Sequence, residues 1–193
     1  GVLFALAPYS YFLYVFGEPS LTGRYFTSVD LISIDRLVSL FADLDQGMVA
    51  GVPGLFAGLL LAAVLVKPPH RAQWLRVLLL CTCIAVAMLV PTLAALNWNS
   101  GSMVMTRYGY WLAAPLCVAL LLAVECLATP QRILVAVVVL SLQSLVLLEH
   151  GVVGQRSNWT KHTAAAAFAL NRFPEAYHPD PEIFYERGIG QEV

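Results

Sequence analysis

Charged residues are scarce in this chain. Only 12% of its 193 residues are Asp, Glu, Lys or Arg, whereas a soluble globular domain carries roughly 25%. Hydrophobic residues make up 59% of the chain. The net charge is −1 and the sequence has no basic cluster, which argues against a nucleic-acid partner. The low content of charged residues and the high content of hydrophobic residues place the chain in the membrane class.

The chain also lacks the marks of a signal peptide and of a cysteine-based site. No basic segment or cleavage site accompanies the opening apolar run, residues 1–16. We interpret this run as a truncated membrane span and expect the chain to be the C-terminal part of a longer protein. The four cysteines lie in apolar runs without zinc-ligand spacing, so we predict no metal site and no disulfide: Cys81, Cys83, Cys117 and Cys126.

Long apolar runs are what the sequence does contain, and they predict an all-α bundle of transmembrane helices. A spanning helix needs about 20 mostly apolar residues. We predict a membrane region over residues 1–150, with an extracytoplasmic tail over residues 151–193. The predicted spans, about five in number with the first truncated, cover residues 1–16, 48–66, 75–96, 111–128 and 133–148.

The distribution of basic residues predicts the orientation of these spans. Lys67–Arg76 and Thr129–Arg132 together carry four Lys or Arg in fourteen residues. The connecting segments on the other side, residues 17–47 and 97–110, carry three in forty-five. Because short cytoplasmic loops are enriched in Lys and Arg, we place the first two segments in the cytoplasm. The tail is then extracytoplasmic.

An amphipathic helix is predicted over Val29–Leu44, in the long extracytoplasmic segment. Thr27 and Asp30 suit a capping box at its start, and Gly47 suits its end. Such a helix lies in the membrane interface or packs as an ordinary surface helix. Its predicted apolar face consists of Leu31, Ile34, Leu37, Val38, Phe41 and Leu44.

A polar, aromatic stretch over Asn97–Trp111 interrupts two apolar runs and holds a single arginine, Arg107. A guanidinium grips a phosphate through two hydrogen bonds, and Trp and Tyr rings anchor a chain at headgroup depth. The simpler alternative is an interface anchor with a snorkelling arginine. The candidate lipid-phosphate-binding residues are Arg107, Tyr108, Asn99 and Trp98.

Asp43 and Asp45 form the best local pair of acids, next to the second predicted span. A carboxylate there suits a general base toward a hydroxyl acceptor. The Asp-x-Asp spacing also leaves a divalent cation open. The alternative is that both are solvated acids at the end of a helix.

Two patterns in the chain belong together. In the first pattern, an acid (Asp43) is followed four residues later by a glycine (Gly47), and the span that comes next has an early proline (Pro53). The second pattern is Trp-Asn-x-Gly-Ser, followed after a short gap by Arg107-Tyr108 and then by Pro115 in the next span. In these features the chain resembles the C-terminal half of bacterial multi-spanning glycosyltransferases of the GT-C class. That class includes polyprenyl-phosphate-mannose protein mannosyltransferases and aminoarabinose lipid A transferases. The tail segment 178–187 is similar to one in uncharacterised bacterial membrane proteins of this type.

The resemblance implies an inner-membrane enzyme that transfers a sugar from a polyprenyl-phosphate donor to an extracytoplasmic acceptor, with inversion and without a soluble nucleotide sugar; no cofactor is implied beyond the divalent cation left open above. Its partners would be membrane lipid and the lipid-linked sugar. Arg107 and Tyr108 match the Arg-Tyr element near the lipid phosphate. The catalytic aspartate of the class lies in the first extracytoplasmic loop, so Asp43 and Asp45 are not matched to it.

Two other functions remain open on the sequence. A transporter or flippase subunit would have paired broken spans and polar residues at the membrane midplane, and the midplane of these spans has almost no ionisable groups. A non-catalytic scaffold of the cell envelope would tolerate neutralisation of Arg107 and of the loop acids.

Overall fold

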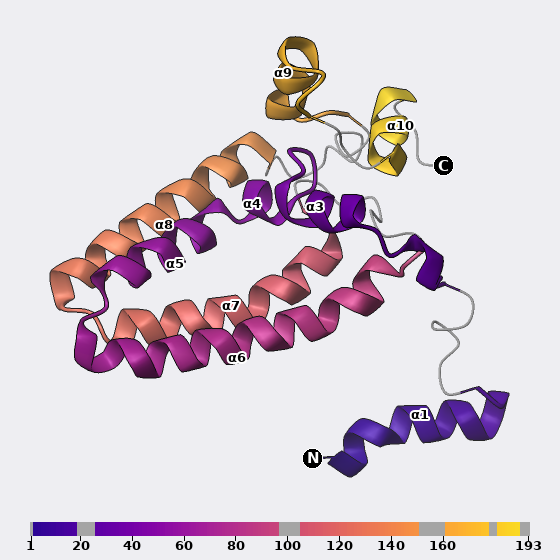
Figure 1. Ribbon diagram of the computed structural model, residues 1–193, viewed down its shortest axis with the longest axis horizontal. Coiled ribbons are helices and arrows are strands. Elements are labelled where there is room, and N and C mark those ends of the chain that lie inside the picture. The colour runs from indigo at the N-terminus through magenta and orange to yellow at the C-terminus, as the bar shows by residue number, and fades with distance from the viewer. Residues whose placement is uncertain (1, 19–25, 97–104, 151–160, 178–180, 190–193) are drawn as a thin grey trace.

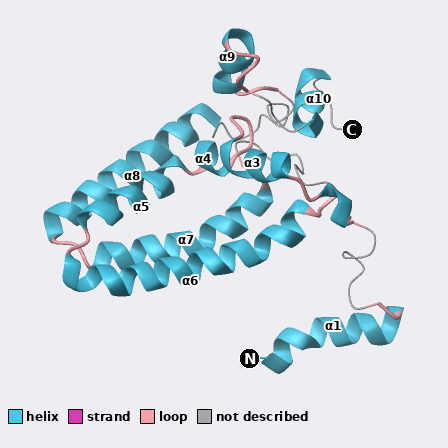
Figure 2. Cartoon of the chain, in the orientation of Figure 1, coloured by secondary structure: helices cyan, strands magenta, loops and turns pink. Residues whose placement is uncertain are grey.

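The computed structural model describes residues 2–18, 26–96, 105–150, 161–177 and 181–189. Within these ranges the regular elements are helices, and the one extended pairing is an isolated antiparallel bridge between Thr27 and Ala95. Figure 2 shows this helical content along the chain. The prediction of an all-α bundle is confirmed.

Four helices build the bundle: α5 (Pro53–Leu65), α6 (Pro68–Leu93), α7 (Arg107–Glu125) and α8 (Thr129–His150). They pack as two pairs, α6 with α7 and α5 with α8, and α5 joins the pairs by packing against α7 (Figure 1). Trp74 is buried between α6 and α7, where its indole N–H donates to the carbonyl of Ala119 at 3.0 Å. The core therefore lies between the helix pairs.

The outer faces of the bundle are apolar. Helices α6, α7 and α8 are long and apolar enough to cross a membrane, whereas α5 has only 13 residues. Large side chains such as Leu79, Leu121 and Leu140 are more than 60% exposed. Bare apolar helix faces of this kind suit a hydrocarbon environment, in which the helical backbone satisfies its own polar groups. The chain is an all-α integral membrane protein.

The helix boundaries correct two of the predicted spans. Helix α6 begins at Pro68, seven residues before the predicted start at Leu75, because proline suits the first turn of a helix. The second predicted span is divided into α4 (Met48–Gly51) and α5. Proline has no N–H to donate and disfavours the helical conformation in the residue before it, and Val52 before Pro53 is accordingly non-helical.

Two of the other predicted spans, residues 111–128 and 133–148, fall on α7 and α8, which are long and apolar enough to cross a membrane. Helix α1 (Val2–Phe16) covers the first apolar run. Helices α7 and α8 each begin four residues before the predicted starts at 111 and 133. Helix α8 has 22 residues, so the last span is longer than the sequence suggested.

Arginines close the C-terminal ends of three bundle helices. The last carbonyls of a helix have no partner within the helix, and a cation also interacts favourably with that end of its dipole. The donors and acceptors are Arg71 to Ala63 on α5, Arg36 to Leu93 and Ala95 at the end of α6, and Arg132 to Glu125 and Leu127 at the end of α7. These bonds satisfy end carbonyls that have no partner within their helices, and the two from Arg36 are buried.

Helices α5 and α8 approach each other closely at Gly54. A Cβ at this position would lie 2.6 Å from the carbonyl oxygen of Val139. Just before α5, the Gln143 amide of α8 donates to the carbonyl of Gly51, the last residue of α4, at 3.1 Å. Because Gly54 has no side chain, the backbones of α5 and α8 can approach closely at this position.

Gly54→Ala should destabilise the bundle by about 1–3 kcal/mol, because α5 and α8 must move apart to admit the methyl group. Reversible unfolding in mixed micelles measures the change. Gly188→Ala is the matched control, since a Cβ at Gly188 meets no atom within 4 Å. Equal stability of the Gly54 variant and the wild type would contradict the close approach.

Candidate functional site

The segment before the bundle differs from the single helix predicted over Val29–Leu44. It consists of a short 3-10 helix, η1 (Val29–Leu31), and of α3 (Ile34–Ala42). Ser33 caps α3 by accepting the Arg36 N–H at 3.1 Å. The predicted capping box at Thr27 was therefore wrong, since Ser33 is a better-placed cap inside the segment. Gly47 precedes α4 instead of ending this helix.

Helix α3 buries only part of the predicted apolar face. Leu37 and Phe41 pack against the core, whereas Ile34 is 77% exposed. The fully buried residues of this helix are Arg36, Ser39 and Leu40. Arg36 is buried because its guanidinium bonds the end of α6. Part of the predicted apolar stripe, including Val38, faces outward, where an interfacial helix meets lipid.

Asp43 folds the chain between α3 and α4 into a tight turn. One carboxylate oxygen accepts the N–H groups of Asp45 at 2.7 Å and Gln46 at 3.0 Å. The other lies 3.3 Å from the hydroxyls of Ser39 and Tyr177. Burial raises the pKa of Asp43, and the two amide hydrogen bonds oppose this rise.

The carboxylate of Asp45 is buried and contacts residues of the tail. Its Oδ1 accepts the backbone N–H of Thr163 at 2.7 Å, and its Oδ2 lies 2.8 Å from Nδ1 of His162. Arg187 Nε is 3.8 Å from the same Oδ2. We call the six residues Asp43, Asp45, His162, Thr163, Tyr177 and Arg187 the aspartate–tail junction.

Two short helices bring the tail to this junction. Thr163 caps α9 (Ala164–Arg172) by accepting the Ala166 N–H at 3.1 Å, and its hydroxyl also donates to the Leu44 carbonyl at 2.9 Å. Helix α10 (Pro181–Ile189) supplies the buried Arg187. Burial raises the pKa of Tyr177, so its hydroxyl stays protonated as a donor to Asp43.

The same turn also contacts the start of α7. The Gln46 carbonyl accepts the Thr106 N–H at 3.1 Å, and the Thr106 hydroxyl caps α7 by accepting the Gly109 N–H at 3.2 Å. The next residue is Arg107. Residues 43–46 therefore tie the tail to the N-terminus of α7.

Of the predicted phosphate-binding residues, Arg107 and Tyr108 are brought together on α7. The Arg107 guanidinium donates to the Tyr108 hydroxyl at 3.1 Å and lies 5.0 Å from the ring centroid. Arg107 is exposed, whereas Tyr108 is buried. Trp98 and Asn99 lie outside the described residues.

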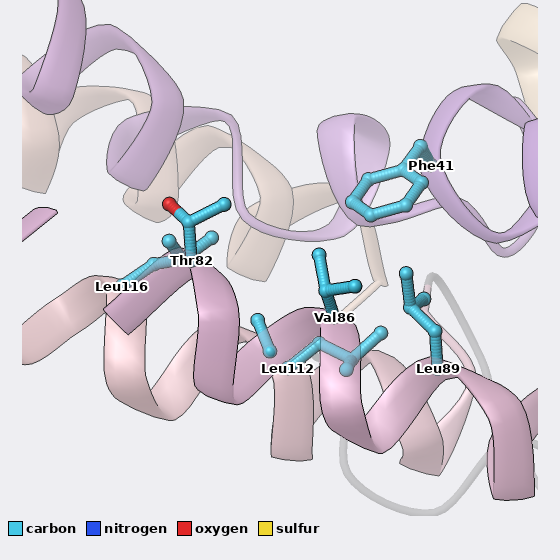
Figure 3. A pocket seen from close by; sticks show the side chains of 7 residues that line it. Phe41, Thr82, Val86, Leu89, Leu112 and Leu116 are labelled. Atoms are coloured by element: carbon cyan, nitrogen blue, oxygen red, sulfur yellow. The ribbon is translucent and has the colours of Figure 1, made fainter. Parts of the chain in front are cut away.

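An apolar cavity of about 80 Å³ lies between α3, α6 and α7 (Figure 3). Tyr108 shares a face of α7 with two of its lining residues, since Leu112 and Leu116 follow it at intervals of four. The cavity is lined by Phe41, Thr82, Ala85, Val86, Leu89, Leu112 and Leu116.

The predicted acids Asp43 and Asp45 lie together in the structure. Several of the residues that contact them, however, were not identified from the sequence. His162, Tyr177 and Arg187 carried no local signal, because the Asp45–His162 contact joins positions 117 residues apart. Within the described ranges, no group of three or more His, Cys, Asp or Glu side chains is arranged to hold a metal ion. The catalytic assignment of the two acids stays a prediction.

Comparisons with protein-family profiles, with curated proteins and with solved structures find no match to this chain. The fold and the site define its class as an all-α integral membrane protein with a polar junction beside the start of a spanning helix.

Asp43→Asn should make stability less dependent on pH. The raised pKa means that the contribution of Asp43 is fully present below its ordinary value of 3.8 and is lost as pH rises through the folded-state pKa. Asparagine keeps an oxygen for the two amides and never ionises. The variant should gain stability relative to the wild type between pH 4 and 7, measured by thermal unfolding in detergent.

The control for this comparison is Asp30→Asn, which neutralises an exposed aspartate of η1. If the stability of the wild type and of Asp43→Asn changed with pH in parallel, ionisation of Asp43 would not lower the stability, and the prediction would be contradicted.

Proposed function

We propose that the chain belongs to a membrane transferase that binds a polyprenyl-phosphate sugar and passes the sugar to an extracytoplasmic acceptor. One observation carries the proposal: Tyr108 stands at the head of the α7 face that lines the apolar cavity, and the guanidinium of the neighbouring Arg107 donates to its hydroxyl. A lipid phosphate can be bound by a cationic side chain at its phosphate and by an apolar cavity along its hydrocarbon chain.

Arg107 supplies the phosphate grip. Tyr108 is its one side-chain partner among the described residues, and that hydrogen bond uses one of the five guanidinium N–H donors. The contact fixes the guanidinium beside a buried ring. The remaining donors, on an exposed side chain, suit a bidentate bond to a phosphate.

The cavity supplies a place for the lipid chain. Leu112 and Leu116 lie five and nine residues beyond Arg107, which is roughly 7 and 13 Å along the helix axis. A prenyl unit in this cavity would leave its phosphate near the start of α7. The rest of the chain would lie against the exposed apolar surface of the bundle.

The distribution of basic residues supports an assignment of the proposed transfer to one side of the membrane. Lys67, Arg71 and Arg76 belong to the α5–α6 turn and the first turns of α6, and Arg107 lies at the opposite end of the bundle (Figure 1). The positive-inside rule assigns the α5–α6 turn to the cytoplasm. In a bacterial inner membrane, the tail and Arg107 then face outward.

Single-cysteine labelling tests this orientation. In a background without the four native cysteines, Lys161→Cys should react with an impermeant maleimide in intact cells. His70→Cys should react only after the membrane is permeabilised. Both side chains are exposed. The reverse pattern would move Arg107 and the tail to the cytoplasm.

Arg107→Ala should weaken binding of undecaprenyl phosphate about 10- to 100-fold, because hydrogen bonds to charged groups contribute roughly 1.5–3 kcal/mol. Native mass spectrometry of the protein in detergent measures the bound lipid. Arg76→Ala is the matched control, since it removes an exposed arginine at the other end of the bundle. Unchanged binding by Arg107→Ala would remove the basis of the proposal.

A second variant separates a lipid from a free phosphate. Ala85→Phe places a ring in the cavity and leaves Arg107 in place. It should weaken binding of undecaprenyl phosphate but not of inorganic phosphate. If only inorganic phosphate depends on Arg107, and the cavity variant binds the lipid normally, the site is an anion site without a lipid chain.

A further inference from the structure

The first tail helix, α9, exposes large aromatic side chains. Phe168 is 65% exposed and Phe173, directly after the helix, is 56% exposed, whereas Ala166 is fully buried. The two rings contact each other edge to face, with their centroids 6.3 Å apart. They therefore form one aromatic patch. An exposed apolar patch commonly marks a surface that contacts another protein or a membrane.

Basic residues flank the aromatic patch at both ends of α9. Lys161 precedes the helix and Arg172 lies in its last turn, and both side chains are exposed. Arg172 follows Phe168 by four residues, so the two side chains share a face of the helix. Residues 161–177 contain one acid, Glu175. Aromatic rings with Lys or Arg beside them are typical of a helix that lies in the plane of a membrane surface.

The aspartate–tail junction holds α9 at the end of the membrane bundle. Thr163, the cap of α9, donates its hydroxyl to the Leu44 carbonyl, and its backbone N–H is accepted by Asp45. Three residues after Asp45 the chain enters α4, whose first residue, Met48, is fully buried. Along the bundle, α9 lies next to the end of α8 and does not extend past the end of α6 (Figure 1). This position is level with the headgroups of a bilayer that the bundle spans.

The lipid-facing surface of the bundle extends to the same place. In the last turns of α8, Leu145, Leu147 and Leu148 are each more than 60% exposed. They belong to a helix that is long and apolar enough to span the membrane, where such side chains meet hydrocarbon. Because α9 lies beside this end of α8, its aromatic patch continues the lipid-facing surface into the headgroup layer. The position of the patch therefore favours a bilayer as its partner.

We propose that α9 is an interfacial helix that binds the membrane surface. Phe168 and Phe173 lie at the boundary between the headgroups and the acyl chains. The exposed cations Lys161 and Arg172 contact anionic headgroups such as phosphatidylglycerol. The tail then has two attachments, one to the protein through Asp45 and one to the bilayer through the aromatic patch. This inference does not depend on the proposed transferase activity.

A spin label on the exposed face of α9 tests the contact and leaves the aromatic patch intact. The label is attached to Ala165→Cys, one turn before Phe168, in a background without the four native cysteines. The full chain is placed in liposomes of phosphatidylethanolamine and phosphatidylglycerol. Oxygen concentrates in the bilayer and a nickel chelate stays in water, so the accessibility of the label to each relaxing agent is measured. High accessibility to oxygen and low accessibility to the chelate are expected.

Two other results of this measurement would overturn the inference. High accessibility to the nickel chelate would place the exposed face of α9 in water. Low accessibility to both agents would mean that protein covers the face, for example a second copy of the chain.

Two substitutions separate the aromatic from the charged contribution, each at an exposed position of α9. Phe168→Ser should shift the labelled helix about 10-fold or more toward the water-exposed state, because the apolar ring is lost. Arg172→Gln should shift it about 5-fold, and only in liposomes that contain phosphatidylglycerol, because one cation near an anionic surface is lost. Arg76→Gln is the matched control, since it removes an exposed arginine at the other end of the bundle. A label equally shielded from the chelate in Phe168→Ser and the wild type would contradict the role of the patch.

Discussion

The burial of the Asp45 carboxylate constrains the end of the structure at which the tail meets the bundle. A carboxylate that is removed from water must be paired or hydrogen-bonded, or its burial costs several kcal/mol. The structure meets this requirement with groups from the tail: the Thr163 amide, the His162 ring and the nearby Arg187 guanidinium. The tail is therefore held against the turn between α3 and α4 by polar contacts, and the placement of that turn depends on them in return.

A second constraint acts on the helices themselves. In an apolar medium the end carbonyls of a helix cannot turn to water, so they need donors from the protein. Arg36 meets this need for α6 and so fixes α3 across the end of the bundle. The position of α3 in turn brings Phe41 over the apolar cavity (Figure 3). A single buried arginine thus couples helix termination to the shape of the proposed lipid site.

The start of α7 and the tail come from distant parts of the chain, and both contact residues 43–46. Gln46 accepts the N–H of Thr106, which precedes α7, and Asp45 contacts His162, which precedes the first tail helix. This turn therefore connects the tail to the end of the bundle at which Arg107 lies.

The sequence by itself determined the helical class and the approximate spans, because long apolar runs and their periodicity act locally. It also singled out Arg107 and Tyr108, which are adjacent in the chain and share a contact. It misjudged the start of α6, where a proline pair begins the helix, and part of the buried face of α3, where Arg36 is buried and Ile34 and Val38 are exposed. Only the tertiary structure decided that Asp45 meets His162, because a contact across 117 residues depends on how the helices pack and leaves no local pattern.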